Sequence, residues 1–242
     1  MKKQILFGVL LLAALATAKA TLFYEGTPGN GVVTTGITST GVGTFNPTIT
    51  DGSTVGTWNQ ISVSGLGSSL TDIRVTLNVS GGNNSDLYAY LSYGGQSVVL
   101  LNRIGVSGST PFGNTGSSLN VTLDSTSGNI HNTAGSGNIS SGSYSADGQT
   151  ISPLSSAGSF SSSGGSITLD AVFGTGSVDP NGTWTLFLAD VVSGGGNETL
   201  NGWSLDITAV PEPVRLSLGV FAAMLLALAG LKWTWRRGFW RG

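Results

Sequence analysis

Residues 72–79 read Asp-Ile-Arg-Val-Thr-Leu-Asn-Val, so apolar and polar side chains alternate along the whole segment. A period of two places apolar side chains on one face of a β-strand and polar side chains on the other. The same alternation recurs in the middle of the chain, at 61–63, 87–91, 119–123, 167–171, 184–188 and 203–207. Turns rich in Gly, Asn and Ser separate these segments, and no segment between residues 21 and 208 shows a helical stripe. The pattern predicts an all-β domain folded as a jelly-roll β-sandwich.

The composition agrees with many short strands and tight turns, because the chain of 242 residues has 38 Gly and only 9% charged residues. The region 21–210 contains eleven acidic residues but only two basic ones, Arg74 and Arg103. This acidic excess argues against a nucleic-acid partner, which needs clustered Lys and Arg to neutralise phosphates. It is compatible with a hard cation such as Ca²⁺. Cysteine is absent, which excludes disulfides and thiolate metal sites.

The N-terminus has the three parts of a signal peptide. Two lysines follow the first Met, an apolar run fills residues 5–16, and Ala18 and Ala20 form a small-x-small cleavage site. We therefore expect residues 1–20 to be a signal peptide, which signal peptidase removes to leave Thr21 as the mature N-terminus. The alternative is a buried N-terminal helix.

The C-terminus carries a second apolar run, at 216–231, which contains no charged residue. As a helix it would be about 24 Å long, slightly less than a hydrocarbon core of about 30 Å. Tryptophans and a cluster of Lys and Arg follow it, so the positive-inside rule keeps this end cytoplasmic and the β domain on the far side. We expect one short transmembrane helix at 216–231, and the alternative is a core helix of the domain.

Directly before this run stand Pro211, Glu212 and Pro213. This tripeptide, followed by an apolar helix and a basic end, resembles the PEP-CTERM sorting signal of Gram-negative bacteria. The resemblance implies that an exosortase recognises the tail, 210–242, and that the inner-membrane precursor passes to the cell envelope or extracellular matrix. Arg215 departs from the pattern by placing a charge between the motif and the helix.

Two later segments are more distinctive than simple alternation. Residues 182–190 read Gly-Thr-Trp-Thr-Leu-Phe-Leu-Ala-Asp, and residues 200–207 read Leu-Asn-Gly-Trp-Ser-Leu-Asp-Ile. With the segment 72–91 they resemble the P domain (P/Homo B), the β jelly roll that follows the catalytic domain in proprotein convertases. Residues 142–154 resemble more loosely a Gly-Tyr-x-Pro-x-x-Pro-Leu stretch of that family.

The resemblance implies one P-domain-like sandwich over 45–208, preceded by an N-terminal extension at 21–44. The final strand departs from the family, since Glu198 and Thr199 stand where a Gly is usual before Leu200. Trp184 and Trp203 lie on alternating segments, so we expect them to fill one shared core, with ligand stacking as the alternative.

Calcium is the one inorganic ligand that we expect. P domains often bind Ca²⁺ through acidic residues at strand ends, and the resemblance places Asp86 and Asp190 at such positions. Asp51 precedes the first well-formed strand and is a third candidate. Carboxylate and carbonyl oxygens from neighbouring loops suit an ion with six to eight ligands. The alternative is that all three are solvated turn residues.

No catalytic residue is expected. His131 is the single histidine, it falls in a predicted loop, and we expect it to be exposed. No Gly-x-Ser-x-Gly motif accompanies it, and one His without Cys cannot form a usual zinc site. The P-domain resemblance could attach the label of a serine endopeptidase to the chain, but no subtilisin domain or triad is present, so we predict that it is not an enzyme.

We therefore expect an exported, non-catalytic surface protein of the cell envelope or extracellular matrix, sorted by an exosortase and structural or adhesive in role. One alternative is a carbohydrate-binding module that exposes Tyr88, Tyr90 and Tyr93 to a polysaccharide. Another is an accessory P domain of a separately encoded subtilisin-like protease.

Overall fold

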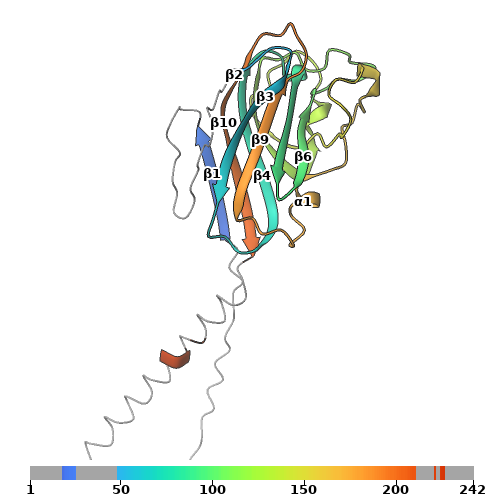
Figure 1. Ribbon diagram of the computed structural model, residues 1–242. Coiled ribbons are helices and arrows are strands. Elements are labelled where there is room, and N and C mark those ends of the chain that lie inside the picture. The colour runs from blue at the N-terminus through green and yellow to red at the C-terminus, as the bar shows by residue number, and fades with distance from the viewer. Residues whose placement is uncertain (1–17, 26–47, 211–220, 222–223, 227–242) are drawn as a thin grey trace, which may run out of the picture.

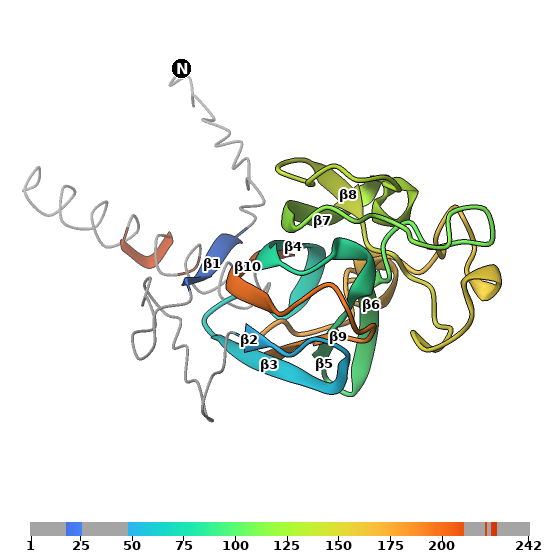
Figure 2. The ribbon, with the colours of Figure 1, turned by 90° about the horizontal axis from the view of Figure 1, so that it is seen from above.

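The computed structural model describes residues 18–25, 48–210, 221 and 224–226. Two β-sheets pack face to face and form a sandwich (Figure 1 and Figure 2). One sheet has six strands, namely β1 (Ala18–Glu25), β10 (Glu198–Val210), β4 (Ser69–Gly81), β7 (Ser118–Asn129), β8 (Ser143–Ser145) and, also on β10, β2 (Thr48–Ile49). The other sheet has four strands in the order β3 (Ser53–Val63), β9 (Gly182–Asp190), β5 (Leu87–Tyr93) and β6 (Gln96–Asn102). The prediction of an all-β sandwich is confirmed.

The chain crosses repeatedly between the two layers, because β3, β5, β6 and β9 belong to one sheet while β4, β7, β8 and β10 belong to the other. Neighbouring strands pair antiparallel, except that β7 and β8 run parallel. Long connections join β6 to β7 and β8 to β9, and they lie beside the sheets (Figure 2). The connection from β8 to β9 carries the short 3-10 helix η3 (Ala157–Ser159) and the helix α1 (Leu169–Val172).

Between the sheets lies one hydrophobic core. The inward side chains of β4 are exposed by 1% at most, as their alternation predicts: Ile73, Val75, Leu77 and Val79. Trp184 and Trp203 belong to this same core, which confirms the prediction for both. Each indole N–H finds an acceptor, since Trp184 donates to the Pro180 carbonyl at 3.0 Å and Trp203 donates to Asn59 Oδ1 at 2.8 Å. Burying an indole is favourable only when its N–H is satisfied in this way.

The predicted strand at 167–171 is wrong, because Leu169–Val172 forms α1. The side chain of Thr168 accepts a hydrogen bond from the amide of Ala171 and caps the helix. Asp170 then accepts a bond from the amide of Ile73 at 3.1 Å, so the turn covers the end of β4 instead of adding a strand. Only Leu169 of the helix is buried. Alternation over so few residues fits a capped helical turn as well as a strand. Here the Thr168 cap favours the helical turn.

At the N-terminus, β1 pairs with β10 from Ala18 to Glu25 and so crosses the predicted cleavage position after Ala20. The sorting motif Pro211–Pro213 lies outside the described residues, as does most of the predicted membrane helix. Of that helix, Phe221 and residues 224–226 are described, and they are helical. Among the helices in the described part of the chain, none has the length and apolar character needed to span a membrane.

Candidate functional site

The three aspartates predicted to bind calcium lie next to strand ends, since Asp51 precedes β3, Asp86 precedes β5 and Asp190 ends β9. Asp190 ends β9, where it pairs with Leu87 of β5 and with Ser53 of β3. Asp86 directly precedes Leu87, and its carbonyl accepts a hydrogen bond from the amide of Val191 at 2.8 Å. The sheet register therefore brings Asp86 and Asp190 side by side, although more than a hundred residues separate them in the chain.

A fourth acidic residue, Glu198, joins this end. It is the first residue of β10, it pairs with Gly81 of β4, and its exposed fraction is 0%. Burial and the neighbouring Asp190 carboxyl raise the pKa of Glu198 to about 9. In the sequence, Glu198 stands out only as a departure from the P-domain pattern. Its position at the start of a strand, beside the loop that leaves Asp190, is the signal that would have found it.

Asp190 and Glu198 form a buried carboxyl pair with unsatisfied oxygens. Asp190 is also 0% exposed, and burial raises its pKa. Its Oδ1 accepts a hydrogen bond from the amide of Val192, but its Oδ2 and both carboxyl oxygens of Glu198 form no hydrogen bond. The two carboxyls bond to each other only when one of them holds a proton. With both ionised, the pair needs a cation, because an uncompensated buried charge is strongly destabilising.

Asp86 is better satisfied. Its two carboxylate oxygens accept from Asn83 Nδ2 at 2.9 Å and from Ser85 Oγ at 3.3 Å, while burial raises its pKa. Glycines make room for this cluster. A Cβ atom on Gly195 would lie 2.8 Å from Asp86 Oδ2, and one on Gly82 would lie 2.2 Å from Glu198 Oε1.

Asp51, the third calcium candidate, makes hydrogen bonds to the loop between β9 and β10. Both of its carboxylate oxygens accept from the amide of Gly194, at 2.9 and 3.1 Å, and its own amide donates to Asn197 Oδ1 at 3.0 Å. Asp51 therefore fastens the loop between β9 and β10. Within the described ranges, no three side chains of the His, Cys, Asp or Glu types converge closely enough to bind one metal ion. Asp190 and Glu198 fit a hard cation by their donor chemistry, and backbone carbonyls or water would have to supply the remaining ligands.

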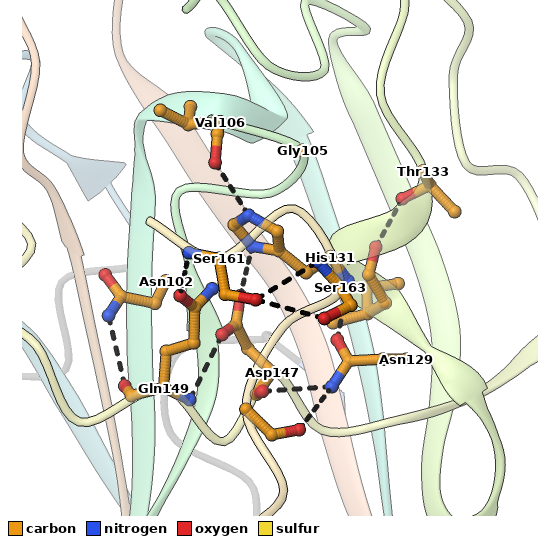
Figure 3. A network of polar contacts seen from close by, with 12 residues as sticks. Asn102, Gly105, Val106, Asn129, His131, Thr133, Asp147, Gln149, Ser161 and Ser163 are labelled. Carbon is orange, nitrogen blue, oxygen red and sulfur yellow. Dashed lines mark hydrogen bonds and ion pairs between the residues drawn. The ribbon is translucent and has the colours of Figure 1, made fainter. Parts of the chain in front are cut away.

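A second polar cluster surrounds His131, and here the sequence prediction is wrong. His131 is 1% exposed instead of lying on the surface. Its Nδ1 lies 2.6 Å from Asp147 Oδ2, and its Nε2 lies 2.8 Å from the carbonyl oxygen of Val106 (Figure 3). Both nitrogens face acceptors, so the doubly protonated imidazolium satisfies both contacts. Burial lowers the pKa of His131, but its bonds to Asp147 and Val106 and the Asp147 charge outweigh this effect and raise it.

The surroundings of His131 tie several loops together (Figure 3). Asn129 accepts from the amide of His131 at 2.8 Å and donates to the carbonyls of Ala146 and Asp147, both at 3.0 Å. The ring of Phe160 stacks on His131 with centroids 6.2 Å apart, and the Arg103 guanidinium lies 5.5 Å from the Phe160 centroid.

The His131–Asp147 pair resembles the base and orienting acid of a hydrolytic triad, but its Nε2 is already bonded to a backbone carbonyl. No ring nitrogen remains to take a proton from a nucleophile. His131 is therefore a structural residue that joins the loop after β6 to the segments after β7 and β8.

The tyrosines proposed for polysaccharide binding divide between the two faces of β5. Tyr88 and Tyr90 point outward, whereas Tyr93 packs against the core, and its ring stacks on Trp184 with centroids 4.1 Å apart. The Tyr93 hydroxyl lies 2.6 Å from the carbonyl oxygen of Asp179 and 2.8 Å from that of Asn181. Tyr93 is thus partly buried against the core instead of being exposed, so the prediction for this tyrosine is wrong.

Comparison with known proteins gives little further information. No model of a known protein family matches the chain, and no curated protein sequence is similar to it. Among solved structures, a chain of the crystallised complex of the Aeromonas sobria serine protease (ASP) and the chaperone (ORF2) aligns with a TM-score of 0.41 and 12% identity. The alignment covers 81% of this chain but only 28% of that chain. At this score and identity, the likeness carries no argument about function.

Proposed function

We propose that this chain is an exported, non-catalytic surface module, structural or adhesive in role, whose sandwich binds Ca²⁺ at the end formed by Asp190 and Glu198. The observation that carries the calcium proposal is the pair of fully buried carboxyls, which leaves three oxygens without a donor. Asp190 and Glu198 would hold the cation directly, and Asp86 would contribute through its charge. A bound Ca²⁺ would supply the positive charge that two ionised carboxylates lack.

The same cluster explains how a cation would stabilise a surface module. Asp190 ends a strand of the four-stranded sheet, and Glu198 begins a strand of the six-stranded sheet. A ligand shared by these two residues would join the two layers at this end of the sandwich. Because such a ligand binds the folded state alone, it would raise the free energy of unfolding.

Export rests on the two ends of the sequence, namely the signal peptide at 1–20 and the PEP-CTERM-like tail at 210–242. The proposed route runs from an inner-membrane precursor, through an exosortase, to the cell envelope or extracellular matrix. Fractionation of native host cells tests this route. Replacing Pro211, Glu212 and Pro213 together by Ala should trap the protein in the inner-membrane fraction, whereas unchanged sorting would contradict the proposal.

A second candidate function, carbohydrate binding, is favoured by the outward aromatic side chains of the four-stranded sheet. An accessory role beside a separately encoded subtilisin-like protease remains a third proposal. Co-purification from the native host tests it, because an accessory domain should carry its protease through gentle affinity capture.

A further inference from the structure

The outer face of the four-stranded sheet carries a row of aromatic side chains that crosses the strands. Trp58 of β3 pairs with Phe187 of β9, Phe187 pairs with Tyr90 of β5, and Tyr90 pairs with Val99 of β6. All four residues occupy outward positions, and the indole of Trp58 is 46% exposed. Tyr88 lies next to the row, with its ring centroid 6.1 Å from that of Tyr90.

The aromatic rings lie close to one another and close to the surface of the sheet. The Tyr90 and Phe187 centroids are 4.9 Å apart with 19° between the ring planes, which is an offset stack. Phe187 reaches over Gly56 of β3, where an added Cβ would lie 2.5 Å from Cζ of the ring. The absence of a side chain at Gly56 therefore lets the aromatic ring lie against the backbone of the next strand.

A second outward row, made of amide and hydroxyl side chains, runs parallel to the aromatic one. It consists of Gln60, Thr185, Ser92 and Ser97, which are register partners across the same four strands. Gln60 Nε2 donates to Thr185 Oγ1 at 3.1 Å, so the row is already ordered. None of the residues in either row carries a charge.

We propose that this face binds a neutral polysaccharide, whose chain lies across the strands along the row from Trp58 through Phe187 to Tyr90. The C–H face of a sugar ring packs on an aromatic surface, and its hydroxyls bond to amide and hydroxyl side chains at the edge. Adjacent strands are spaced by about 4.8 Å, close to the length of one sugar residue in an extended chain. The absence of charge on a chain that is otherwise acidic selects a neutral ligand over an anionic one.

The width of the aromatic row favours a linear polymer over a folded protein. A protein interface has a continuous dry centre with a polar rim, whereas this narrow row, with Tyr88 at its side, runs beside hydroxyl and amide groups. The inference deepens the proposed function by naming a partner, and it rests on that function only for placing the face outside the cell. Binding by the purified protein depends neither on export nor on calcium.

Affinity electrophoresis tests the proposal with the full chain, purified in a detergent without a sugar headgroup. Gels would contain cellulose derivatives, xylan, galactomannan or dextran as neutral probes and alginate as the anionic comparison. We expect retardation by at least one neutral probe and none by alginate. Trp58→Ala and Phe187→Ala should each weaken the affinity by about tenfold or more, as loss of a central aromatic contact does.

Phe112→Ala is the matched control, because Phe112 is 79% exposed but lies in the loop between β6 and β7. It should bind like the unchanged chain, and thermal melting should show that all variants are folded. Retardation by alginate alone, no retardation by any probe, or equal binding by the Trp58 variant would overturn the proposal. A dimer in sedimentation that Trp58→Ala converts to monomer would also overturn it, because the face would then join two copies.

A gel series in EDTA separates this inference from the calcium proposal, and fractionation of host cells separates it from export. Neutral-glycan binding that persists in EDTA would leave the inference standing even if the melting curves show no calcium site. Conversely, calcium-dependent melting without any retardation would leave the proposed function standing and remove this inference.

Discussion

Asp190 and Glu198 place two fully buried carboxyl groups against each other, one at the end of β9 and the other at the start of β10. A turn of seven residues, 191–197, separates them in the chain and connects the two sheets. The folded state tolerates this arrangement when the two carboxyls share a proton or a cation. It is destabilised when both carboxyls are ionised without a cation.

Calcium should raise the melting temperature of the full chain. At a free concentration of a hundred times Kd, binding to the folded state alone adds about 2.7 kcal/mol to the free energy of unfolding. Differential scanning calorimetry in CaCl₂ and in EDTA measures the difference. Glu198→Gln should abolish it, while Asp72→Asn at the opposite end of β4 should preserve it. Coincident curves for the unchanged chain would refute the site.

In EDTA, the free energy of unfolding should fall as the pH rises from about 4.5, the ordinary pKa of Glu, to about 9. The folded state raises the pKa of Glu198 to about 9, so the folded state keeps a proton that the unfolded state releases above about pH 4.5. One retained proton gives a slope of up to about 1.4 kcal/mol per pH unit. Urea unfolding across this range measures the slope, and Glu198→Gln should reduce it, most clearly below about pH 6.5, where His131 adds no slope. An equally steep slope in that variant would mean that another group causes the pH dependence.

Removing one partner of the His131–Asp147 pair should destabilise the fold severely. His131→Phe leaves the Asp147 carboxylate buried without its cation, a change that costs about 3–5 kcal/mol in comparable pairs. Urea unfolding at pH 6 measures the loss. The double variant His131→Phe with Asp147→Leu should lose less than the sum of the single variants. Additive losses would show that the two side chains are not coupled.

The His131–Asp147 pair also makes stability depend on pH. Here the folded state favours the charged form of the group, whereas at Glu198 it favours the neutral form. The pKa of His131 is raised in the folded state, so its contribution to stability is complete below about pH 6.5 and is lost as pH rises through the folded value. The pH titration of the His131 ring, followed by NMR on the folded protein, should therefore have its midpoint above 6.5. A midpoint below 6.5 would mean that the ring is neutral and that the pair is not ionic.

Trp203→Phe should cost about 1–3 kcal/mol beyond the small loss of apolar area, because it leaves Asn59 Oδ1 buried without its donor. Adding Asn59→Leu to that variant removes the unpaired group and should recover part of the loss. Chemical denaturation of both variants measures the effect. If the double variant is less stable than the single one, the Asn59 carbonyl has found another partner.

Protein exported by the native host should begin at Thr21. Signal peptidase accepts only small side chains at positions 18 and 20, so replacing Ala18 and Ala20 by Leu should leave uncleaved precursor in the inner membrane. N-terminal sequencing of exported protein that finds Met1 would disprove the assignment of residues 1–20 as a signal peptide.

Much of the fold was already determined by short-range patterns in the sequence. The alternation at 72–79 predicts β4 and its buried face, because the side-chain period of a strand follows from backbone geometry alone. The same rule also places Tyr90 and Tyr93 on opposite faces of β5, since three positions separate them. The exposure predicted for Tyr93 ignored a signal that the sequence contained.

The tertiary structure alone decided the polar sites. Glu198 and Asp86 both lie beside Asp190 because β10 and β5 begin where β9 and β4 end, which no local pattern records. His131 is buried because loops after β6, β7 and β8 close over it and supply Asp147 and the Val106 carbonyl. Alternation depends on neighbours along the chain, so the sequence by itself determined the strands and their apolar faces. The burial of a charged group depends on partners brought from other segments, so only the packed fold could determine which carboxylates and which ring nitrogen lie away from water.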